Sequence, residues 1–185
     1  MKKKIVLLGD SIRKIGYGPV VKQRLEPEFD VWDMEDNGRY TQHTFRYFRD
    51  YCNELQGTDL FHWNNGLWDQ GDFFGDGPFT PLDHYVENML RILRMMKTFT
   101  PKIIFATTTP VHPDFPYHRL ERTKLYNDTI VPLLQKEGVI INDLFSVMLP
   151  HRFDGIRDDL IHLNDLGIRL CADQTERIIR ETINS

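Results

Sequence analysis

Three side chains at opposite ends of the chain have the chemistry needed for acyl transfer. Ser11 lies in the stretch Gly9-Asp10-Ser11, and Asp159 and His162 lie three residues apart near the C-terminus. A serine hydroxyl becomes an effective nucleophile when an imidazole removes its proton, and a third group must hold that imidazole in the right tautomer. These residue types predict nucleophilic catalysis by Ser11, with His162 as the base and Asp159 as the group that orients it.

The position of Ser11 depends on the first apolar run of the chain. Residues Lys4 to Leu8 are almost all aliphatic and do not alternate with polar residues, which predicts a strand buried on both faces of a parallel sheet. Ligands of open α/β sheets bind outside the carboxyl ends of the strands, so Ser11 is expected to face a substrate. Gly, Asp and Ser are also common turn formers, and the tripeptide alone is equally consistent with a plain turn.

Four further apolar runs predict strands, and helical patterns separate them. The expected strands are 4–8, 29–32, 59–63, 102–107 and 139–143, and the main expected helices are 41–55, 81–96, 120–136 and 165–182. Residues 12–18 are expected to form a loop, followed by a short helix that Pro19 opens. Alternating strands and helices favour one three-layer α/β/α domain over residues 1–185, with a flavodoxin-like five-stranded parallel sheet in the order 2-1-3-4-5.

The sequence resembles the SGNH or GDSL hydrolase superfamily along nearly its whole length. The resemblance rests on Gly9-Asp10-Ser11 and on Asp159-x-x-His162, and less closely on Asn37-Gly38 and residues 64–69. It implies a carboxylic-ester hydrolase with a Ser11, His162 and Asp159 triad, and with no cofactor or metal.

The same loop offers alternatives for the base and the carboxylate. His151 and Asp154 lie close by in the sequence, and Asp158 is adjacent to Asp159. The spacing of Asp159 and His162 matches the family pattern, and both residues immediately precede the last predicted helix. We therefore prefer this pair and interpret Asp158 as a surface charge.

The resemblance also implies an oxyanion hole, to which the backbone N–H groups of Ser11 and Gly38 contribute. Asn-Gly is in the first place a turn signal, so this role for Gly38 comes from the resemblance. The family usually reads Gly-x-Asn-Asp in its third block, where the Asn side chain is a further donor. Aligning Gly66 and Asp69 with that block places Trp68 where the Asn is expected.

Three side chains are candidates for this third donor. An indole N–H donates a single hydrogen bond and accepts none, so Trp68 is a limited substitute for an amide. Strand alternation puts Asn64 on the face of His62, and we favour Asn64, with Trp68 or Asn65 as alternatives. Both asparagines also suit a turn in which each side chain bonds its own backbone.

Composition and charge exclude several classes of function. The chain has 185 residues, 41% of them hydrophobic, and a net charge of -4, with no basic cluster beyond Lys2 to Lys4. We therefore expect no nucleic-acid partner. No apolar run is long enough for a secretory signal or a membrane span, which predicts a cytoplasmic protein. The sequence gives no indication of the oligomeric state.

Cysteine and histidine usage gives no sign of a disulfide framework or a metal centre. Cys52 and Cys171 lie far apart in predicted helices and are expected to be free thiols. The seven histidines show no ligand spacing typical of a metal site, so we expect no bound metal.

These observations favour a serine esterase that removes a small acyl group, by analogy acetyl, from an alcohol or a sugar. A lysophospholipase or acyl-thioester hydrolase is the nearest alternative and would need a long apolar channel. A non-catalytic flavodoxin-like binding module is a second alternative, although the first turn lacks a G-x-G-x-x-G pattern. A pseudo-enzyme is a third, because the third block is altered.

Overall fold

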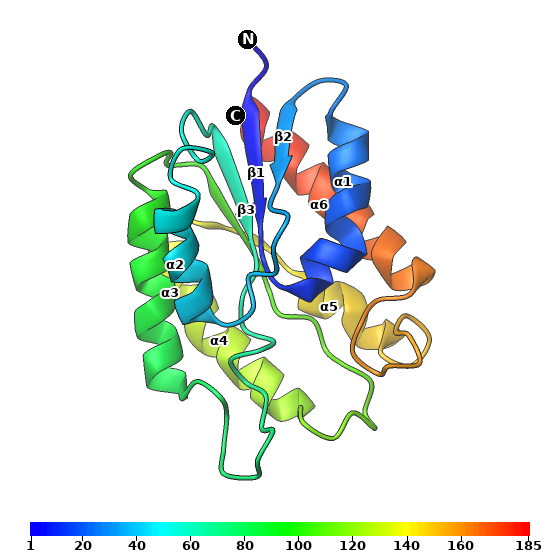
Figure 1. Ribbon diagram of the computed structural model, residues 1–185. Helices are drawn as coiled ribbons and strands as arrows, with labels where there is room; N and C mark the ends of the chain where they lie inside the picture. Colours follow the sequence, from blue (N-terminus) through cyan, green and yellow to red (C-terminus); the bar gives the residue numbers. More distant parts are fainter.

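Five parallel strands form a single sheet between two layers of helices (Figure 1). The computed structural model describes residues 1–185. The strands are β1 (Lys4–Leu8), β2 (Asp30–Asp33), β3 (Leu60–Trp63), β4 (Ile103–Ala106) and β5 (Ile140–Asn142). Their order is β2-β1-β3-β4-β5, and every neighbouring pair is parallel. The predicted fold class and strand order are confirmed.

The helices divide between the two faces of the sheet. One face is covered by α1 (Gly18–Leu25), α5 (Leu144–Met148) and α6 (Asp165–Asn184), and the other by α2 (Thr41–Asp50), α3 (Leu82–Met96) and α4 (Leu120–Lys136) (Figure 1). A short 3₁₀ turn, η2 (Leu149–His151), follows α5. Asn164 caps α6, because its side chain accepts the N–H groups of Leu166 and Gly167.

The alternation of side chains along β1 divides the core into two clusters. Ile5 and Leu7 pack against the α1, α5 and α6 layer, whereas Val6 and Leu8 pack against α2, α3 and α4. All four side chains are buried, as the unbroken apolar run predicts. Both faces of β1 are therefore held in place, and the residues that follow it leave the sheet from a fixed point.

The segment after Ser11 differs from the loop that we expected for residues 12–18. The chain turns at once into a helical segment, which includes the π-helical turn η1 (Arg13–Tyr17) and leads into α1. Gly16 interrupts it with φ -112° and ψ -113°, where the two helical pieces meet at a kink. The prediction of a loop was wrong because Gly16 lies at the kink between two helical pieces and Gly18 begins α1, so neither glycine ends the helical segment.

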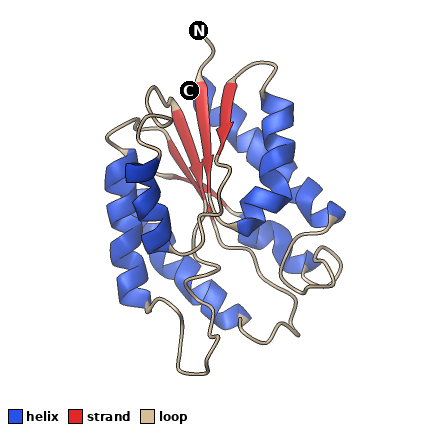
Figure 2. Cartoon of the chain, in the orientation of Figure 1, coloured by secondary structure: helices blue, strands red, loops and turns tan.

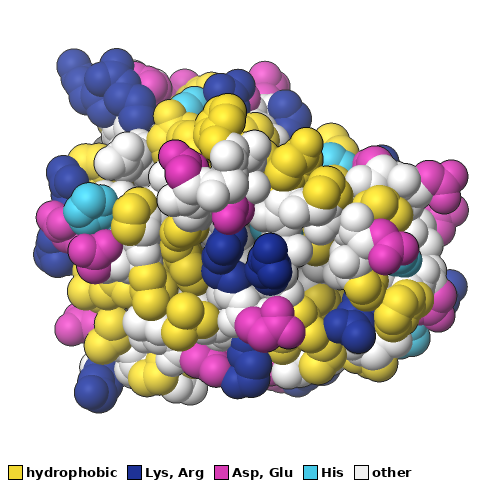
Figure 3. Space-filling view, turned by 90° about the horizontal axis from the view of Figure 1, so that it is seen from below, with side chains coloured by type: hydrophobic (Ala, Val, Ile, Leu, Met, Phe, Trp, Pro, Cys, Tyr) yellow, Lys and Arg dark blue, Asp and Glu magenta, His cyan; other side chains and the backbone are white.

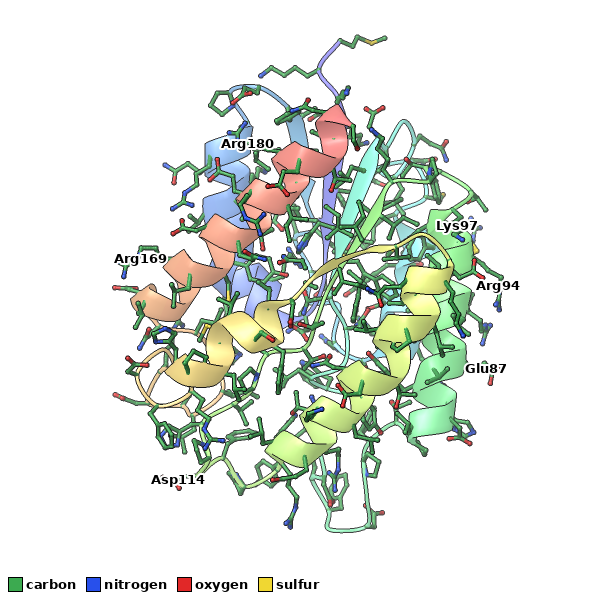
Figure 4. All side chains as sticks on the ribbon, turned by 180° about the vertical axis from the view of Figure 1, so that it is seen from behind. Glu87, Arg94, Lys97, Asp114, Arg169 and Arg180 are labelled. Atoms are coloured by element: carbon green, nitrogen blue, oxygen red, sulfur yellow. The ribbon has the colours of Figure 1, made fainter.

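Charged side chains occupy the outer surfaces of the helices. Figure 4 shows Arg94 on α3, Lys97 just after α3 and Arg180 on α6 projecting away from the sheet. Arg180 pairs with Glu28 at 2.8 Å and with Glu176 at 2.9 Å, and exposed pairs of this kind contribute little to stability. None of the helices combines the length and the apolar character needed to cross a lipid bilayer.

Loops gather at the carboxyl ends of the strands, the lower end of the molecule in Figure 2. This edge receives the turn after β1, the segment after β3 and the long connection between α5 and α6. Residues that are far apart in the chain meet there.

Candidate active site

The nucleophile candidate lies on a tight turn between β1 and the following helical segment. A Cβ added at Gly9 would lie 1.8 Å from Asn64 Oδ1, so only glycine fits beside that side chain. Asp10 Oδ1 accepts the N–H of Ile12 at 2.9 Å, which closes the turn. Ser11 itself is buried, with 8% of its surface exposed, and its N–H donates to no other group of the protein.

The structure brings Ser11, His162 and Asp159 into one hydrogen-bonded chain. His162 Nε2 lies 3.0 Å from Ser11 Oγ, and His162 Nδ1 lies 2.8 Å from Asp159 Oδ2. An ionised carboxylate only accepts hydrogen bonds, so Nδ1 carries the proton and the Nε2 lone pair faces the serine hydroxyl. This is the tautomer that a general base for Ser11 requires.

Asp159 also organises the loop that carries it. Its Oδ1 accepts the N–H groups of Ile161 at 3.0 Å and His162 at 2.9 Å. Partial burial raises the pKa of the carboxyl, but these two N–H groups and the imidazole outweigh that effect and lower the pKa to about 2. The carboxylate is therefore ionised throughout the neutral pH range.

Backbone hydrogen bonds hold the rest of this loop in place. The Arg157 N–H donates to His162 O at 2.7 Å, and the His112 N–H donates to Leu160 O at 3.0 Å. Leu160 adopts a left-handed φ of 68°, which an L-residue with a bulky side chain adopts at a cost. Its position between Asp159 and His162 shows that the loop is bent to bring the two side chains together.

The other candidates for the base and the carboxylate take no part in the hydrogen bonds that join Ser11, His162 and Asp159. His151 Nδ1 is 3.2 Å from Asp154 Oδ1, so these two residues form a separate pair with the same sequence spacing. Asp158 is exposed and makes no hydrogen bond or ion pair.

Gly38 lies beside the nucleophile turn but differs from our expectation. Its N–H donates to Gly9 O at 2.8 Å, so it is not free to face an oxyanion. A Cβ at Gly38 would lie 2.7 Å from the same carbonyl oxygen. The glycine is needed because the two backbone segments approach closely, and its expected role as an oxyanion donor is corrected to a role in holding Gly9.

Asn64 is the asparagine that reaches the nucleophile turn. Its Nδ2 donates to Asp10 Oδ1 at 2.9 Å, and its Oδ1 accepts the hydroxyl of Tyr17 at 3.2 Å. These two contacts fix the orientation of the amide and use only one of its two N–H groups. The second N–H has no hydrogen-bond partner within the protein.

The alternatives to Asn64 have other surroundings. Asn65 is fully buried: its Oδ1 accepts the indole N–H of Trp63 at 2.6 Å, and its Nδ2 donates to Arg39 O and Thr44 Oγ1. It is a structural residue, so the alternative role of Asn65 is not supported. Trp68 is 36% exposed and lines a cavity beside Ser11, with no hydrogen bond on its indole.

Arg13 is an important residue of this region that the sequence did not reveal. Its guanidinium is fully buried and donates to Met34 O at 2.7 Å, Asp36 O at 2.9 Å and Gly9 O at 3.1 Å. It also pairs with Asp33. Arg13 therefore ties the turn after β1 to the segment after β2. Nothing in its sequence position distinguishes it from a surface arginine.

The described residues include no group of three His, Cys, Asp or Glu side chains that could hold a metal ion. Cys52 and Cys171 are both free.

The chain is similar to known proteins in sequence and in fold. No family model matches the chain. A curated relative, the GDSL esterase/lipase CPRD49 of Arabidopsis thaliana, is 34% identical over 125 aligned positions, and the match covers 58% of this chain and 48% of the relative. The chain thus matches about half the length of that protein.

Solved structures share the fold at low sequence identity. A lipase/acylhydrolase from Enterococcus faecalis has a TM-score of 0.81 at 20% identity, with 97% of this chain and 96% of that chain covered. The acetyl xylan esterase AlAXEase has a TM-score of 0.78 at 18% identity, with 95% and 99% covered. Axe2, an acetylxylan esterase from Geobacillus stearothermophilus, has a TM-score of 0.77 at 17% identity, with 96% and 94% covered. The chain therefore has the fold of the SGNH hydrolases and shares sequence with a GDSL esterase/lipase, which confirms the resemblance that its Gly-Asp-Ser and Asp-x-x-His motifs predict.

Proposed function

We propose that this protein is a serine esterase that hydrolyses esters of a small acyl group. The observation that carries the proposal is the contact chain from Ser11 Oγ to His162 Nε2 at 3.0 Å and from His162 Nδ1 to Asp159 Oδ2 at 2.8 Å. It joins residues 151 positions apart in the sequence. The similarity to a GDSL esterase/lipase supports a carboxylic-ester hydrolase.

The reaction follows from the position of each proton. Ser11 Oγ attacks the ester carbonyl while His162 Nε2 takes the hydroxyl proton, and the charged imidazole then gives that proton to the departing alcohol. A water molecule attacks the acyl-serine with the same help from His162, which releases the acid. Asp159 keeps the imidazole in position and stabilises its charged form.

Two N–H groups are available to stabilise the oxyanion. They are the backbone N–H of Ser11 and the second N–H of Asn64 Nδ2. A donor of this kind contributes about 2.7–4 kcal/mol to the transition state of acyl transfer. Gly38 supports the hole indirectly, because its N–H holds the carbonyl of Gly9.

We propose an acetyl ester of an alcohol or a sugar as the substrate. Two of the structural neighbours are acetylxylan esterases, and this is the support for acetyl. A lysophospholipase or acyl-thioester hydrolase differs in requiring a long acyl chain. A higher kcat/KM for p-nitrophenyl palmitate or an acyl thioester than for p-nitrophenyl acetate would favour that alternative. The free cysteines fit a reducing compartment, and we propose the cytoplasm as the location.

Hydrolysis of p-nitrophenyl acetate by the wild-type protein and by Ser11→Ala tests the proposal. A single hydroxyl at the edge of the sheet supports no core packing, so the variant should fold normally. Its kcat should fall by a factor on the order of 10³ to 10⁶, as for the loss of a triad nucleophile. Unchanged turnover in a folded Ser11→Ala protein would exclude the serine mechanism, and a wild-type protein without activity would favour a binding module or a pseudo-enzyme.

A further inference from the structure

A small cavity of about 160 Å³ opens beside Ser11 and His162. The remaining residues of its lining are Leu67, Trp68, Phe73, His118 and Ile161. Leu67 and His118 are buried and form its inner part, whereas Trp68 and Phe73 are 36% and 38% exposed and form its outer walls. A group bonded to Ser11 Oγ can therefore extend into a mostly apolar space.

His118 adds no charge to this cavity. Its Nε2 lies 2.6 Å from Leu67 O, and a carbonyl oxygen only accepts, so Nε2 carries the proton. Nδ1 is buried and has no partner. Burial lowers the pKa of the imidazole, which keeps the ring neutral. The contact with Leu67 also fixes the inner wall of the cavity.

Phe73 is held as a fixed outer wall. Its ring packs against Tyr117 at 5.4 Å between centroids and edge-on against His118 at 6.2 Å. A Cβ at Gly71 would lie 2.6 Å from the Phe73 ring, so the glycine leaves the space that the ring occupies.

The loop that carries Phe73 is also fixed by its own hydrogen bonds. Asp72 Oδ1 accepts the N–H groups of Gly75 at 2.9 Å and Gly77 at 3.3 Å, and the Asp72 N–H donates to Tyr117 O at 2.9 Å. The next residue, Phe74, is 85% exposed and is not part of the cavity lining. Hydrophobic side chains are exposed at several places on this end of the molecule (Figure 3).

The volume sets a limit on what the cavity can hold. Pockets that bury a whole drug-sized ligand measure roughly 300–1,000 Å³, so this cavity holds only part of a substrate. At about 30 Å³ for a water-sized group, 160 Å³ holds roughly five non-hydrogen atoms. An acetyl, propionyl or butyryl group fits, whereas an octanoyl chain is too large to lie wholly inside the cavity.

We infer that this cavity is the acyl pocket and that Phe73 sets the upper limit of acyl length. The inference rests on the proposed esterase function and extends it to a substrate class, esters of short unbranched acids. The acyl group is assigned to the cavity because it stays bonded to Ser11 Oγ in the intermediate, whereas the alcohol must leave. An apolar space without a free charged partner suits an alkyl chain better than a sugar.

A chain-length profile with two neighbouring alanine variants tests the inference. The kcat/KM values for p-nitrophenyl acetate, butyrate, octanoate and laurate are measured with wild type, Phe73→Ala and Phe74→Ala. Wild type should prefer acetate and butyrate. Phe73→Ala should raise kcat/KM for octanoate by roughly 10- to 100-fold, because a substrate group that does not fit an apolar pocket lowers kcat/KM by about this factor. It should change kcat/KM for acetate little. Phe74→Ala makes the same truncation one residue away and should keep the wild-type profile.

A further variant and a second substrate series complete the experiment. Phe73→Leu keeps an apolar side chain, so it protects the test against misfolding of Phe73→Ala and should extend the profile to an intermediate length. A series of alkyl acetates varies the alcohol instead of the acid, and all variants should treat this series alike. A response of Phe73→Ala confined to the alcohol series would overturn the acyl assignment.

The failure of the inference differs from the failure of the proposed function. A wild-type protein that hydrolyses esters only when Ser11 is present, with the same acyl profile in both Phe73 variants, overturns the inference and leaves the esterase function intact. A wild-type protein with no Ser11-dependent hydrolysis overturns both.

Discussion

The two halves of the candidate triad lie in opposite environments. Ser11 is 8% exposed, and the residues around it, Arg13 and Asn64, are 0% and 5% exposed. On the other half, the Asp159 side chain is 45% exposed and that of His162 is 24% exposed. The nucleophile lies among buried polar residues at the edge of the sheet, whereas the base and its carboxylate lie on a surface loop.

This difference predicts how each half responds to substitution. Around Ser11, the buried Arg13 and Asn64 hold several turns together, so substitution of either of these two residues should lower both stability and activity. The loop of Asp159 and His162 is held mainly by its own backbone hydrogen bonds, which a conservative substitution leaves in place. Changes there should lower activity and leave stability nearly unchanged.

The largest effect on activity alone is expected for Asp159→Asn. The Asn Oδ1 can still accept the N–H groups of Ile161 and His162, so the loop keeps its shape, but its Nδ2 donates toward His162 Nδ1 and favours the wrong tautomer. In the chymotrypsin-type triad this change lowers kcat on the order of 10⁴-fold. We expect a loss of this size in kcat/KM for p-nitrophenyl acetate with little change in the urea midpoint. Asp158→Asn is the matched control, and a greater loss in that variant would show that the carboxylate is misassigned.

Arg13→Met tests the buried half. The substitution keeps an apolar side chain of similar length but leaves Asp33 and three backbone carbonyls without their donor. Removal of one partner of a buried ion pair costs about 3–5 kcal/mol of unfolding free energy. Urea unfolding measures this loss, with the exposed Arg46→Met as control. If Arg13→Met is as stable as the control, the proposed difference between the two halves is wrong.

Asn64→Ala and Trp68→Phe separate the two candidate oxyanion donors. Loss of Asn64 should lower kcat by roughly 10²- to 10³-fold with little change in KM, because the interaction forms in the transition state. Trp68→Phe removes an exposed indole N–H and should have a small effect. Steady-state kinetics of both variants measure these effects. Equal and small reductions of kcat in the two variants would mean that backbone N–H groups alone form the oxyanion hole.

The pH dependence of stability gives a smaller effect on the buried half. Burial, together with the positive charge of Arg13, lowers the pKa of His62 to about 3. An unfolded histidine titrates near about 6.5, so the unfolded state takes up the proton first and stability is lost as the pH falls from about 6.5 toward 3. Between pH 7 and pH 4.5 the loss from His62 should be about 2.5 kcal/mol.

Urea unfolding of wild type and His62→Gln over this range isolates the contribution of His62. The variant should lose less stability on acidification than wild type does. The exposed His84→Gln is the control and should follow the wild-type profile. Parallel profiles for wild type and His62→Gln would show that His62 is not buried in its neutral form.

The sequence predicts the sheet well because the pattern that indicates a strand lies within the strand itself. The run from Lys4 to Leu8 is apolar on both faces, and a strand buried on both faces must be central in a parallel sheet. The Asp159-x-x-His162 spacing likewise brings two side chains together within one loop. The fold class follows from patterns of this kind, and the strand order follows from the flavodoxin-like arrangement that such a class of fold commonly adopts.

The direction in which a single N–H group or side chain points depends on contacts between distant segments, so the sequence could not predict it. The Gly38 N–H points to Gly9 O because the turns after β1 and β2 approach closely, which no pattern near Gly38 reveals. Arg13 is buried because three carbonyls from two segments surround it. Phe73 and Phe74 are adjacent and identical in type, and only the folded loop decides which of them lines the cavity.

The central claim is that Ser11 is the nucleophile and that His162 activates it. Reaction with a short-chain alkyl fluorophosphonate tests this claim without a natural substrate, because a bond from Ser11 Oγ to phosphorus forms as fluoride leaves. Mass spectrometry of the intact protein and of its peptides should find one label per chain, on Ser11, with no label in Ser11→Ala and much slower labelling in His162→Ala. Labelling of Ser11→Ala at the wild-type rate, or of another residue in the wild-type protein, would contradict the account.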